Sequence, residues 1–401
     1  MIRNSVFAAC FSVALTASVA FAQVPSPDVS SDAEASGTSP IAYVYVANTP
    51  VNSKANEIVA YAASATGRLS PVSGSPFPDN VYSMAVNGKY LMAANVTKPD
   101  IDAYLIGSDG SLTYTTSTNY AKFNDPNNPC GSAGLMFFDH TGASLYVIEY
   151  DASNACANLV IASFSVEKGS GGLGYLGLAS SGTFPGDYTP AYFIGDNLYA
   201  YAADQSACMY PGLYGYQRES NGLLNFINNF NANYPTPPPG VRVYYPDLAV
   251  ADSTNHLAIL EQPANPPGCA NGPVQLATYT VEKNGNIHTN STYKNMPAPK
   301  VQNVFDMKVS PSGKLLAVGG TEGLQIFHFN GGGPITRYTG LITTDSITQM
   351  FWDNNDHLYA ISQTSGKLLV FTITPTTHKM AAGSPYAINQ PQNIIVQPLS
   401  H

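Results

Sequence analysis

Short apolar stretches with period-two alternation recur along the chain, and turns rich in Gly, Asn and Asp separate them. One repeating unit, residues 83–114, shows the pattern in full. Alternation over four to six residues is typical of half-buried β-strands, and an Asn-Gly pair between two such stretches predicts a hairpin. The unit therefore predicts four strands, at residues 83–86, 90–95, 101–104 and 112–114.

The unit occurs seven times along the chain. Its second strand is expected at residues 43–48, 90–95, 145–149, 198–202, 257–261, 315–320 and 358–362. Its third strand is expected at residues 58–61, 101–104, 161–164, 213–216, 276–279, 324–327 and 368–371. Four-stranded units repeating about every 40–55 residues indicate a β-propeller, in which each unit is one blade.

The two ends of the series predict how the ring closes. The first unit begins near Tyr43 and lacks an innermost strand, whereas residues 392–396 form a spare strand after the last unit. We therefore expect an all-β, seven-bladed β-propeller over residues 41–401, closed by a C-terminal strand that joins the first blade. Two tandem domains are the alternative, but no linker-like stretch interrupts the series.

The N-terminal residues predict export. Arg3 precedes an apolar run at residues 6–20, and Ala20-Phe21-Ala22 is a small-x-small cleavage site. These features indicate a signal peptide over residues 1–22, cleaved near Ala22, and a secreted or periplasmic product. Residues 23–40 are rich in Ser, Pro, Asp and Ala, which predicts a disordered linker.

Composition excludes several classes of partner. The net charge is −9, charged residues are only 11% of the chain, and no basic run occurs. Nucleic acid is therefore not an expected partner. No stretch beyond the signal is apolar and long enough to span a membrane. We expect a monomer. No Cys/His spacing suggests zinc, and neither a metal nor another cofactor is expected.

Four cysteines remain after removal of the signal peptide, and an even number in an exported protein favours two disulfides. The four lie in loops at Cys130, Cys156, Cys208 and Cys269. Three pairings are possible. We favour Cys130–Cys156 within one blade and Cys208–Cys269 between neighbouring loops.

Several short sequence motifs are similar to those of a known family. They are Tyr43-Val44-Tyr45-Val46-Ala47-Asn48, Gly74-Ser75-Pro76-Phe77, its echo Gly383-Ser384-Pro385-Tyr386, and the stretch Ser310-Pro311-Ser312-Gly313-Lys314-Leu315. The chain resembles the seven-bladed lactonase-type propellers, which include 6-phosphogluconolactonase and muconate cycloisomerases, and in particular their extracellular branch with the YVTN repeat. The resemblance implies a lactonase-type hydrolase.

Candidate site residues come from the repeat. Second strands end at the face where inner strands begin, so their last residues should surround the mouth of the central channel, at Asn48, Asn95, Glu149, Ala202, Glu261, Gly320 and Ser362. Arg242, Tyr244 and Asn303 precede inner strands on the same rim. We predict Glu149, Glu261 and Arg242 as catalytic groups, because a carboxylate near an arginine can activate water against an ester carbonyl. Asn48, Asn95, Tyr244 and Asn303 are the predicted substrate-binding residues. The alternative is that such side chains only bond to backbone at strand ends.

Two further features bear on function. Three histidines, His140, His256 and His357, fall in or beside hairpin turns, where we expect a solvated role. Asp247 and Asp306 occupy similar places in two inner strands, where we expect bonds to backbone.

Two functions remain open. One is a lactonase-like hydrolase that acts on a small carbonyl substrate in the channel. The other is a non-catalytic propeller of the cell envelope that binds an extracellular ligand or protein through a tyrosine-rich rim.

Overall fold

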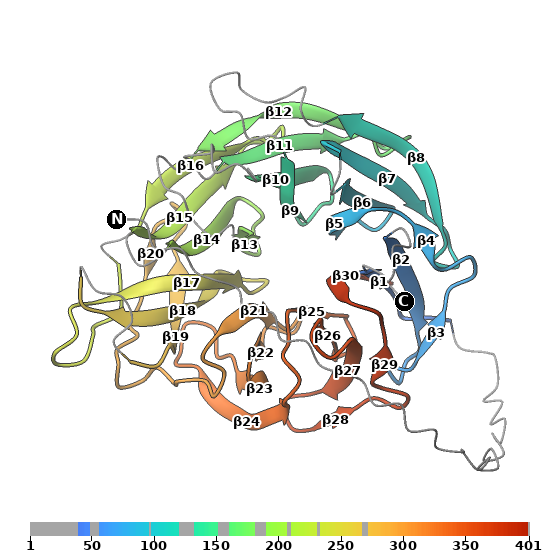
Figure 1. The fold of residues 1–401 in the computed structure, drawn as a ribbon. Coiled ribbons are helices and arrows are strands. Elements are labelled where there is room, and N and C mark those ends of the chain that lie inside the picture. Colours follow the sequence, from blue (N-terminus) through green and yellow to red (C-terminus); the bar gives the residue numbers. More distant parts are fainter. Residues whose placement is uncertain are drawn as a thin grey trace, which may run out of the picture. The chain divides into compact units, whose positions relative to one another are not determined.

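The computed structural model describes residues 39–48, 56–95, 98–119, 132–150, 160–180, 190–206, 210–230, 233–266 and 272–399. All of them belong to one compact unit, Thr38–His401. Within this part of the chain every regular element is a β-strand, and the strands form seven separate antiparallel sheets around a common centre (Figure 1). The predicted seven-bladed propeller is therefore confirmed.

Each sheet is one blade, and its strands run from the centre outward. The innermost strands, from blade one to blade seven, are β30 (Pro391–Pro398), β5 (Val81–Val86), β9 (Ser132–Phe138), β13 (Tyr192–Phe193), β17 (Val243–Ala251), β21 (Val304–Val309) and β25 (Gln349–Trp352). The second strands are β1 (Ala42–Asn48), β6 (Tyr90–Asn95), β10 (Ser144–Tyr150), β14 (Tyr199–Ser206), β18 (His256–Ala264), β22 (Leu315–Gly320) and β26 (His357–Ser362).

The outer half of each blade completes the sheet. The third strands are β2 (Glu57–Ala63), β7 (Asp100–Ile106), β11 (Val160–Val166), β15 (Tyr210–Arg218), β19 (Gln275–Val281), β23 (Gly323–His328) and β27 (Lys367–Ile373). The outermost strands are β3 (Leu69–Pro71) with β4 (Phe77–Pro78), β8 (Leu112–Asn119), β12 (Leu173–Ser180), β16 (Leu224–Asn229), β20 (Ile287–His288), β24 (Thr336–Thr343), and β28 (His378–Met380) with β29 (Tyr386–Ala387).

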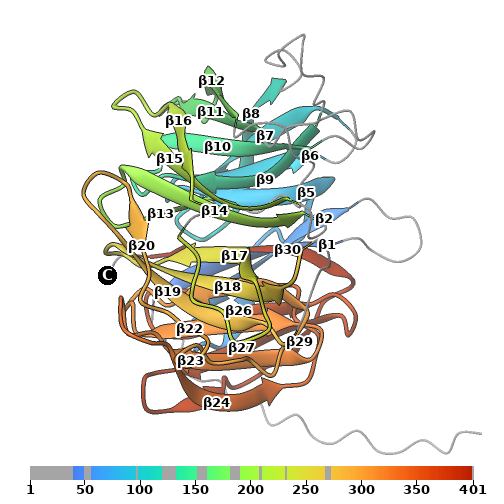
Figure 2. The ribbon, with the colours of Figure 1, turned by 90° about the vertical axis from the view of Figure 1, so that its left-hand side faces the viewer.

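The C-terminal strand closes the ring. β30 pairs antiparallel with β1, so that Tyr45 faces Ile395 and Val44 faces Val396 (Figure 2). This pairing supplies the innermost strand that the first blade lacks, as the sequence predicts. It also joins the two ends of the repeat series within one sheet, which leaves no blade open at the closure.

The hydrophobic core lies between neighbouring blades. Each apolar cluster joins the facing sides of two sheets; one contains Tyr45 of blade one and Leu91 of blade two, both fully buried. Tyrosine hydroxyls reinforce several of these contacts. Tyr146 donates to the carbonyl of Gly222 in the next blade at 2.7 Å, and Tyr201 donates to that of Gly285 at 2.7 Å.

The glycines in these outer turns are required for close packing. Gly110 has a φ of +82°, and a Cβ at this position would overlap the ring of Tyr43 in the preceding blade. Gly285 has the same φ, and its Cβ would meet Tyr199 at 2.5 Å. Turn conformation and blade packing therefore select glycine together.

Side chains on the inner strands cap the edge of the next blade. Asn393 Oδ1 accepts a hydrogen bond from Met84 N at 3.0 Å, and Asp306 Oδ2 accepts one from Met350 N at 2.7 Å. These bonds satisfy amide groups on the free side of β5 and of β25. The expectation that Asp306 bonds to backbone inside the ring is confirmed. Asp247 does not share its place as predicted: the register of β17 shifts between Pro246 and Leu248, so Leu248 is the residue equivalent to Asp306.

Two further expectations need correction. The second strand of blade four is β14 (Tyr199–Ser206), which is longer than predicted, so Asp204 and not Ala202 occupies the place equivalent to Glu261. The prediction failed because it placed the start of this strand one residue early and its end four residues early. His357 is not solvated: it is 1% exposed, and its Nδ1 lies 2.8 Å from Asp353 Oδ2.

Some predictions fall on residues outside the described part of the chain. They include the signal peptide, most of the linker and the four cysteines, so both disulfides stay predictions. Among the described residues, no helix is long and apolar enough to cross a bilayer.

Candidate functional site

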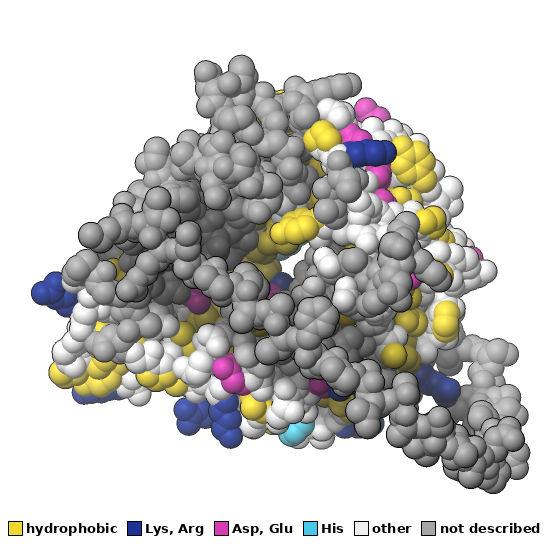
Figure 3. All heavy atoms as spheres, viewed as in Figure 1, with side chains coloured by type: hydrophobic (Ala, Val, Ile, Leu, Met, Phe, Trp, Pro, Cys, Tyr) yellow, Lys and Arg dark blue, Asp and Glu magenta, His cyan; other side chains and the backbone are white. Residues whose placement is uncertain are grey.

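A cavity of about 1040 Å³ occupies the centre of the ring. Residues from the innermost strands of all seven blades line it, and Figure 3 shows the hollow at the middle of the molecule with hydrophobic side chains on its wall. A channel of this size is large enough for a small organic ligand. It is therefore the candidate functional site.

The wall of the cavity is built in layers, because alternate residues of a strand share a face. The first layer is Asn393, Ser83, Leu135, Pro190, Leu248, Asp306 and Gln349, one residue from each blade. The second layer lies two residues further along each chain and is Ile395, Ala85, Phe137, Tyr192, Val250, Lys308 and Phe351. Across both layers only Asp306 and Lys308 carry charge.

These two charged residues form one cluster with a tyrosine from another blade. Lys308 Nζ lies 2.9 Å from Asp306 Oδ1 and donates to the hydroxyl of Tyr192 at 2.7 Å. The same ammonium lies 5.0 Å from the ring centroid of Tyr192 and 5.2 Å from that of Phe351. Lys308 of blade six therefore reaches blade four and blade seven at once.

Burial and charge oppose each other in this cluster. Burial alone would lower the pKa of Lys308, but Asp306 and Tyr192 outweigh it and raise that pKa above its ordinary value. Burial raises the pKa of Asp306, and Lys308 opposes this increase. Burial also raises the pKa of Tyr192. The lysine is therefore cationic and the phenol is protonated at neutral pH.

The cluster retains hydrogen-bonding capacity toward the channel. An ammonium has three donors, of which Asp306 and Tyr192 take two. Because the Tyr192 oxygen accepts from Lys308, its own proton is free to be donated elsewhere. Asp306 accepts from Lys308 on one oxygen and from Met350 N on the other, and a carboxylate has about four acceptor sites in all. Two donors and a carboxylate thus lie together in a largely apolar wall.

Glu261, a predicted catalytic residue, lies away from the cavity wall. Its side chain is 0% exposed; Tyr279 donates to Oε1 at 2.7 Å, and Oε2 is buried with no hydrogen-bond partner among the described residues. Burial raises the pKa of Glu261 to about 8, although the bond from Tyr279 lowers it. Glu261 is therefore largely protonated at neutral pH.

The structure does not bring Arg242 to Glu261. The guanidinium of Arg242 is exposed and donates to the carbonyl of Pro266 at 3.1 Å. Tyr244 is buried and donates to Gln275 Oε1, and Asn303 is exposed just before β21. None of these residues lines the cavity.

Asn48 and Asn95, two predicted substrate-binding residues, also lie outside the described cavity lining. Asn48 is 5% exposed and donates to Glu57 Oε1 at 3.3 Å, while Asn95 Oδ1 accepts from Lys98 N at 3.1 Å. Glu149 lies in β10, but its side chain is not among those described. The roles assigned to these residues from the sequence stay predictions.

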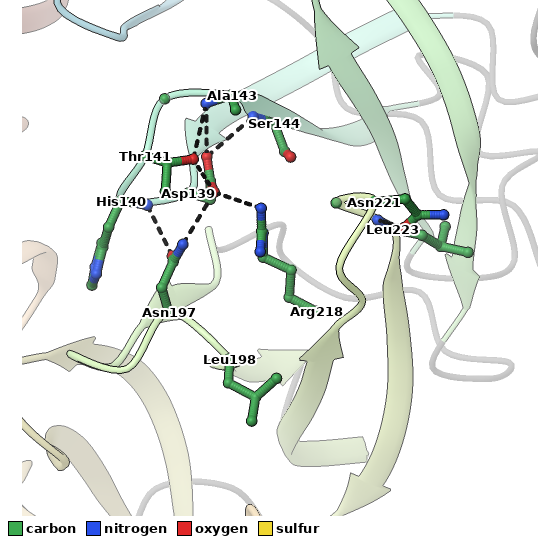
Figure 4. Close-up of polar contacts among 12 residues, drawn as sticks. Asp139, His140, Thr141, Ala143, Ser144, Asn197, Leu198, Arg218, Asn221 and Leu223 are labelled. Carbon is green, nitrogen blue, oxygen red and sulfur yellow. Dashed lines mark hydrogen bonds and ion pairs between the residues drawn. The ribbon is translucent and has the colours of Figure 1, made fainter.

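The turns that follow the inner strands end the cavity with satisfied carboxylates. Asp139 is held by Arg218 Nη2 at 3.0 Å, Asn197 Nδ2 at 3.1 Å and Thr141 Oγ1 at 2.7 Å (Figure 4). Burial would raise the pKa of Asp139, but hydrogen bonds to Thr141 and Ser144 contribute to a net lowering. This cluster connects blades three and four and has a structural role.

A sequence signal for the cluster does exist. Asp306 and Lys308 are two residues apart on a predicted inner strand, so they share a face. At the position of Lys308 most other blades carry an apolar residue, such as Val250 or Phe351. A lysine at an otherwise apolar repeat position marks the site, whereas its contact with Tyr192 needs the closed ring.

Comparisons with known proteins agree with this architecture. No protein-family model and no curated protein matches the chain. Among solved structures, a candidate 6-phosphogluconolactonase of Bacteroides fragilis aligns with a TM-score of 0.60 and 12% identity, over 92% of this chain and 99% of that one.

Two further structures share the fold. The periplasmic gluconolactonase of Pseudomonas aeruginosa has a TM-score of 0.60 and 14% identity, over 88% of this chain and 98% of its own. Hydrazine synthase of Kuenenia stuttgartiensis has a TM-score of 0.52 and 10% identity, and the alignment covers 87% of this chain and 99% of that one. At such identities the likeness establishes the fold alone: this chain is a seven-bladed β-propeller with the architecture of 6-phosphogluconolactonase-like proteins.

Proposed function

We propose that this protein is a lactonase-like hydrolase that opens a small cyclic ester inside the central channel. One observation carries the proposal: the only charges in the two layers of the channel wall belong to Asp306 and Lys308, which form a single cluster with Tyr192. Ester hydrolysis needs a base for water and donors for the developing oxyanion, and this cluster offers both.

The proposed reaction is a direct attack by water. Asp306 accepts a proton from the water as its oxygen bonds to the lactone carbonyl carbon. The third ammonium proton of Lys308 and the hydroxyl proton of Tyr192 stabilise the oxyanion. The bond from the carbonyl carbon to the ring oxygen then breaks, and that oxygen takes the proton from Asp306. The product is the open hydroxy acid.

The apolar surroundings strengthen these interactions. Phe137, Val250 and Phe351 share the layer of Lys308, so little of the wall competes for its charge. An electrostatic interaction is stronger in such a setting than in water. The solved structures named as lactonases support the proposal through their shared fold, without identifying the substrate.

We also propose that the protein acts outside the cytoplasm. The apolar run at residues 6–20 and the cleavage motif at residues 20–22 support export. One neighbour in fold is described as periplasmic. Fractionation of the host cells, with N-terminal sequencing of the recovered chain, tests this: a start near Gln23 supports export, and an intact Met1 in the cytoplasm contradicts it.

Lactone hydrolysis is the direct test of the activity. The purified protein is assayed by pH-stat against γ-butyrolactone, δ-valerolactone, glucono-1,5-lactone and dihydrocoumarin, with uncatalysed hydrolysis subtracted. We expect turnover of at least one lactone. Lys308→Met should lower kcat about 10²- to 10³-fold, since it removes one oxyanion donor. Asp306→Asn should lower kcat about 10²- to 10⁴-fold, since it removes the base.

A matched control separates the cluster from general effects of charge. Lys314 lies in an exposed turn of the same blade, so Lys314→Met should retain wild-type kcat. Absence of turnover on every lactone contradicts the proposal and favours a binding function. Loss of turnover in Glu261→Gln, with Lys308→Met still active, would instead move the reaction to the predicted rim residues.

A further inference from the structure

We infer that the channel selects uncharged ring-shaped ligands and discriminates against phosphorylated ones. This inference rests on the proposed function for its choice of ligand, and it concerns binding, which is measured apart from turnover. Two observations carry it: the balance of charge along the cavity, and two exposed aromatic side chains in its lining, one in blade two and one in blade six. Both lie at the end where the inner strands begin, which we call the mouth.

Among the described residues, the lining offers no cluster of cations for a phosphate. It contains Lys308 and His140 as basic residues, against the carboxylates of Asp139, Asp252 and Asp306. Asp306 balances the charge of Lys308, and Asp306 and Tyr192 together take two of its three donors. Burial lowers the pKa of His140, which keeps its imidazole neutral at pH 7. Phosphate binding usually relies on several charge-assisted donors, and here the acidic groups outnumber the cationic ones.

The aromatic pair follows from irregular strand pairing. The register of β5 shifts between Val81 and Ser83, and that of β21 shifts between Val304 and Asp306. The extra residues at these bulges are Tyr82 and Phe305. A β-bulge redirects a side chain out of the regular pleat, and bulges are common beside binding sites.

Both bulge residues are presented to solvent at the cavity. Tyr82 is 45% exposed and Phe305 is 51% exposed, and both belong to the cavity lining. What sets them apart from an exposed aromatic such as Tyr114 is their place in the cavity lining, where an aromatic face can contact a ligand. Their flat faces suit the C–H-bearing face of a saturated ring. An uncharged lactone ring satisfies both the aromatic mouth and the charge balance below it.

The protein carries its own reporter for this test. Trp352 is the single tryptophan of the chain, and it lines the cavity. Its indole N–H donates to the carbonyl oxygen of Lys308 at 3.3 Å. A ligand in the channel should therefore change the tryptophan fluorescence, whether or not it is hydrolysed.

The experiment compares two inert ligands that differ by one phosphate. D-glucono-1,5-lactam and its 6-phosphate are titrated against the full-length protein, and Trp352 fluorescence gives each Kd. We expect the phosphorylated lactam to bind at least tenfold more weakly. Equal or tighter binding of the phosphorylated lactam, or no binding of either, overturns the inference.

Variants at the mouth test each observation separately. Tyr82→Ala and Phe305→Ala should each weaken lactam binding about three- to tenfold, as expected for loss of one aromatic contact. Tyr114→Ala is the control, since Tyr114 is 55% exposed on the outermost strand of blade two and should leave Kd unchanged. Gln392 occupies the equivalent bulge in blade one and lines the cavity. Gln392→Lys should tighten binding of the phosphorylated lactam alone.

The outcomes also separate this inference from the proposed activity. Selective binding of the neutral lactam without hydrolysis of any lactone leaves the inference standing and removes the hydrolase. Hydrolysis with no preference between the two lactams does the reverse. Unchanged Kd values in both aromatic variants, with native thermal unfolding, overturn the role of the mouth.

Discussion

Two buried acids in neighbouring blades show why one carboxyl group forms a site and the other does not. Glu261 in β18 and Asp306 in β21 are 0% and 7% exposed. Asp306 accepts from the Lys308 ammonium at 2.9 Å and from Met350 N at 2.7 Å. Glu261 accepts from the Tyr279 hydroxyl at 2.7 Å, while its other oxygen has no hydrogen-bond partner in the part of the chain that the structure describes.

The difference lies in what compensates the charge. Burial raises the pKa of both groups, but a cation opposes the increase only at Asp306. Glu261 remains protonated at neutral pH because a phenol is weak compensation for a buried carboxylate. Burial by itself therefore does not identify a reactive acid; a nearby cation and access to the channel do.

Removal of the Lys308 ammonium should leave the Asp306 carboxylate without a compensating charge. Lys308→Met leaves a buried carboxylate without its partner, which typically destabilises a protein by about 3–5 kcal/mol. Urea unfolding followed by circular dichroism measures the change. The double variant Lys308→Met/Asp306→Asn should recover most of the lost stability without recovering turnover. A single-variant loss below about 1 kcal/mol would mean that solvent already compensates Asp306.

Glu261 should make stability depend on pH. Its pKa is about 8 in the folded state and 4.5 for the free side chain. Between these values the folded state binds more protons than the unfolded state, so the free energy of unfolding falls as pH rises from about 4.5 to about 8. One pKa unit corresponds to about 1.4 kcal/mol, so the total loss is a few kcal/mol.

Glu261→Gln should remove this dependence, since the amide keeps the shape but does not ionise. Urea unfolding at a series of pH values from 4 to 9 measures it. Glu282→Gln, at an exposed position in the same blade, should retain the wild-type slope. A Glu261→Gln protein with an unchanged slope would show that another group titrates in this range.

The phenol of Tyr279 should have a smaller effect of the same kind. Tyr279→Phe removes the hydrogen bond that lowers the pKa of Glu261, so stability should fall by about 1 kcal/mol and continue to fall above pH 8. Tyr201→Phe is the matched control, because it loses a 2.7 Å bond to a backbone carbonyl without contacting an acid. The control should lower stability equally at every pH.

The fold could be predicted because its information is local and repeated. Alternating strands and glycine turns recur in each blade, and the missing inner strand near Tyr43 predicts the role of residues 392–396. The glycines recur because each must both adopt a positive φ and fit against the next blade, as at Gly110. Because every blade needs the same strands and turns, the same residue pattern recurs in the sequence.

The candidate site could be predicted only in part, because it depends on register and on ring closure. Bulges such as that at Phe305 shift the strand by one residue, and the alternation alone does not locate them. The contact between Lys308 and Tyr192 joins blades four and six, 116 residues apart. The ends of the second strands predict Glu261 as a rim residue. Its burial against Tyr279 of β19 depends on tertiary packing, which the alternation does not show.

The smallest expected effect concerns Asp247, whose charge contributes to the raised pKa of Glu261. Asp247→Asn should lower the pKa of Glu261 by a fraction of a unit, because one nearby negative charge is removed while burial is unchanged. The upper limit of the pH range in which stability falls should therefore move to lower pH, as urea unfolding between pH 6 and 9 can show. Asp356→Asn, in a turn of blade seven where φ is 62°, tests for a general effect of the lost charge and should leave the limit unchanged. A shift to higher pH in Asp247→Asn would mean that Asp247 orders a hydrogen-bond donor toward Glu261. Glu261 and Asp306 would then differ more in their hydrogen bonds than in the charges around them.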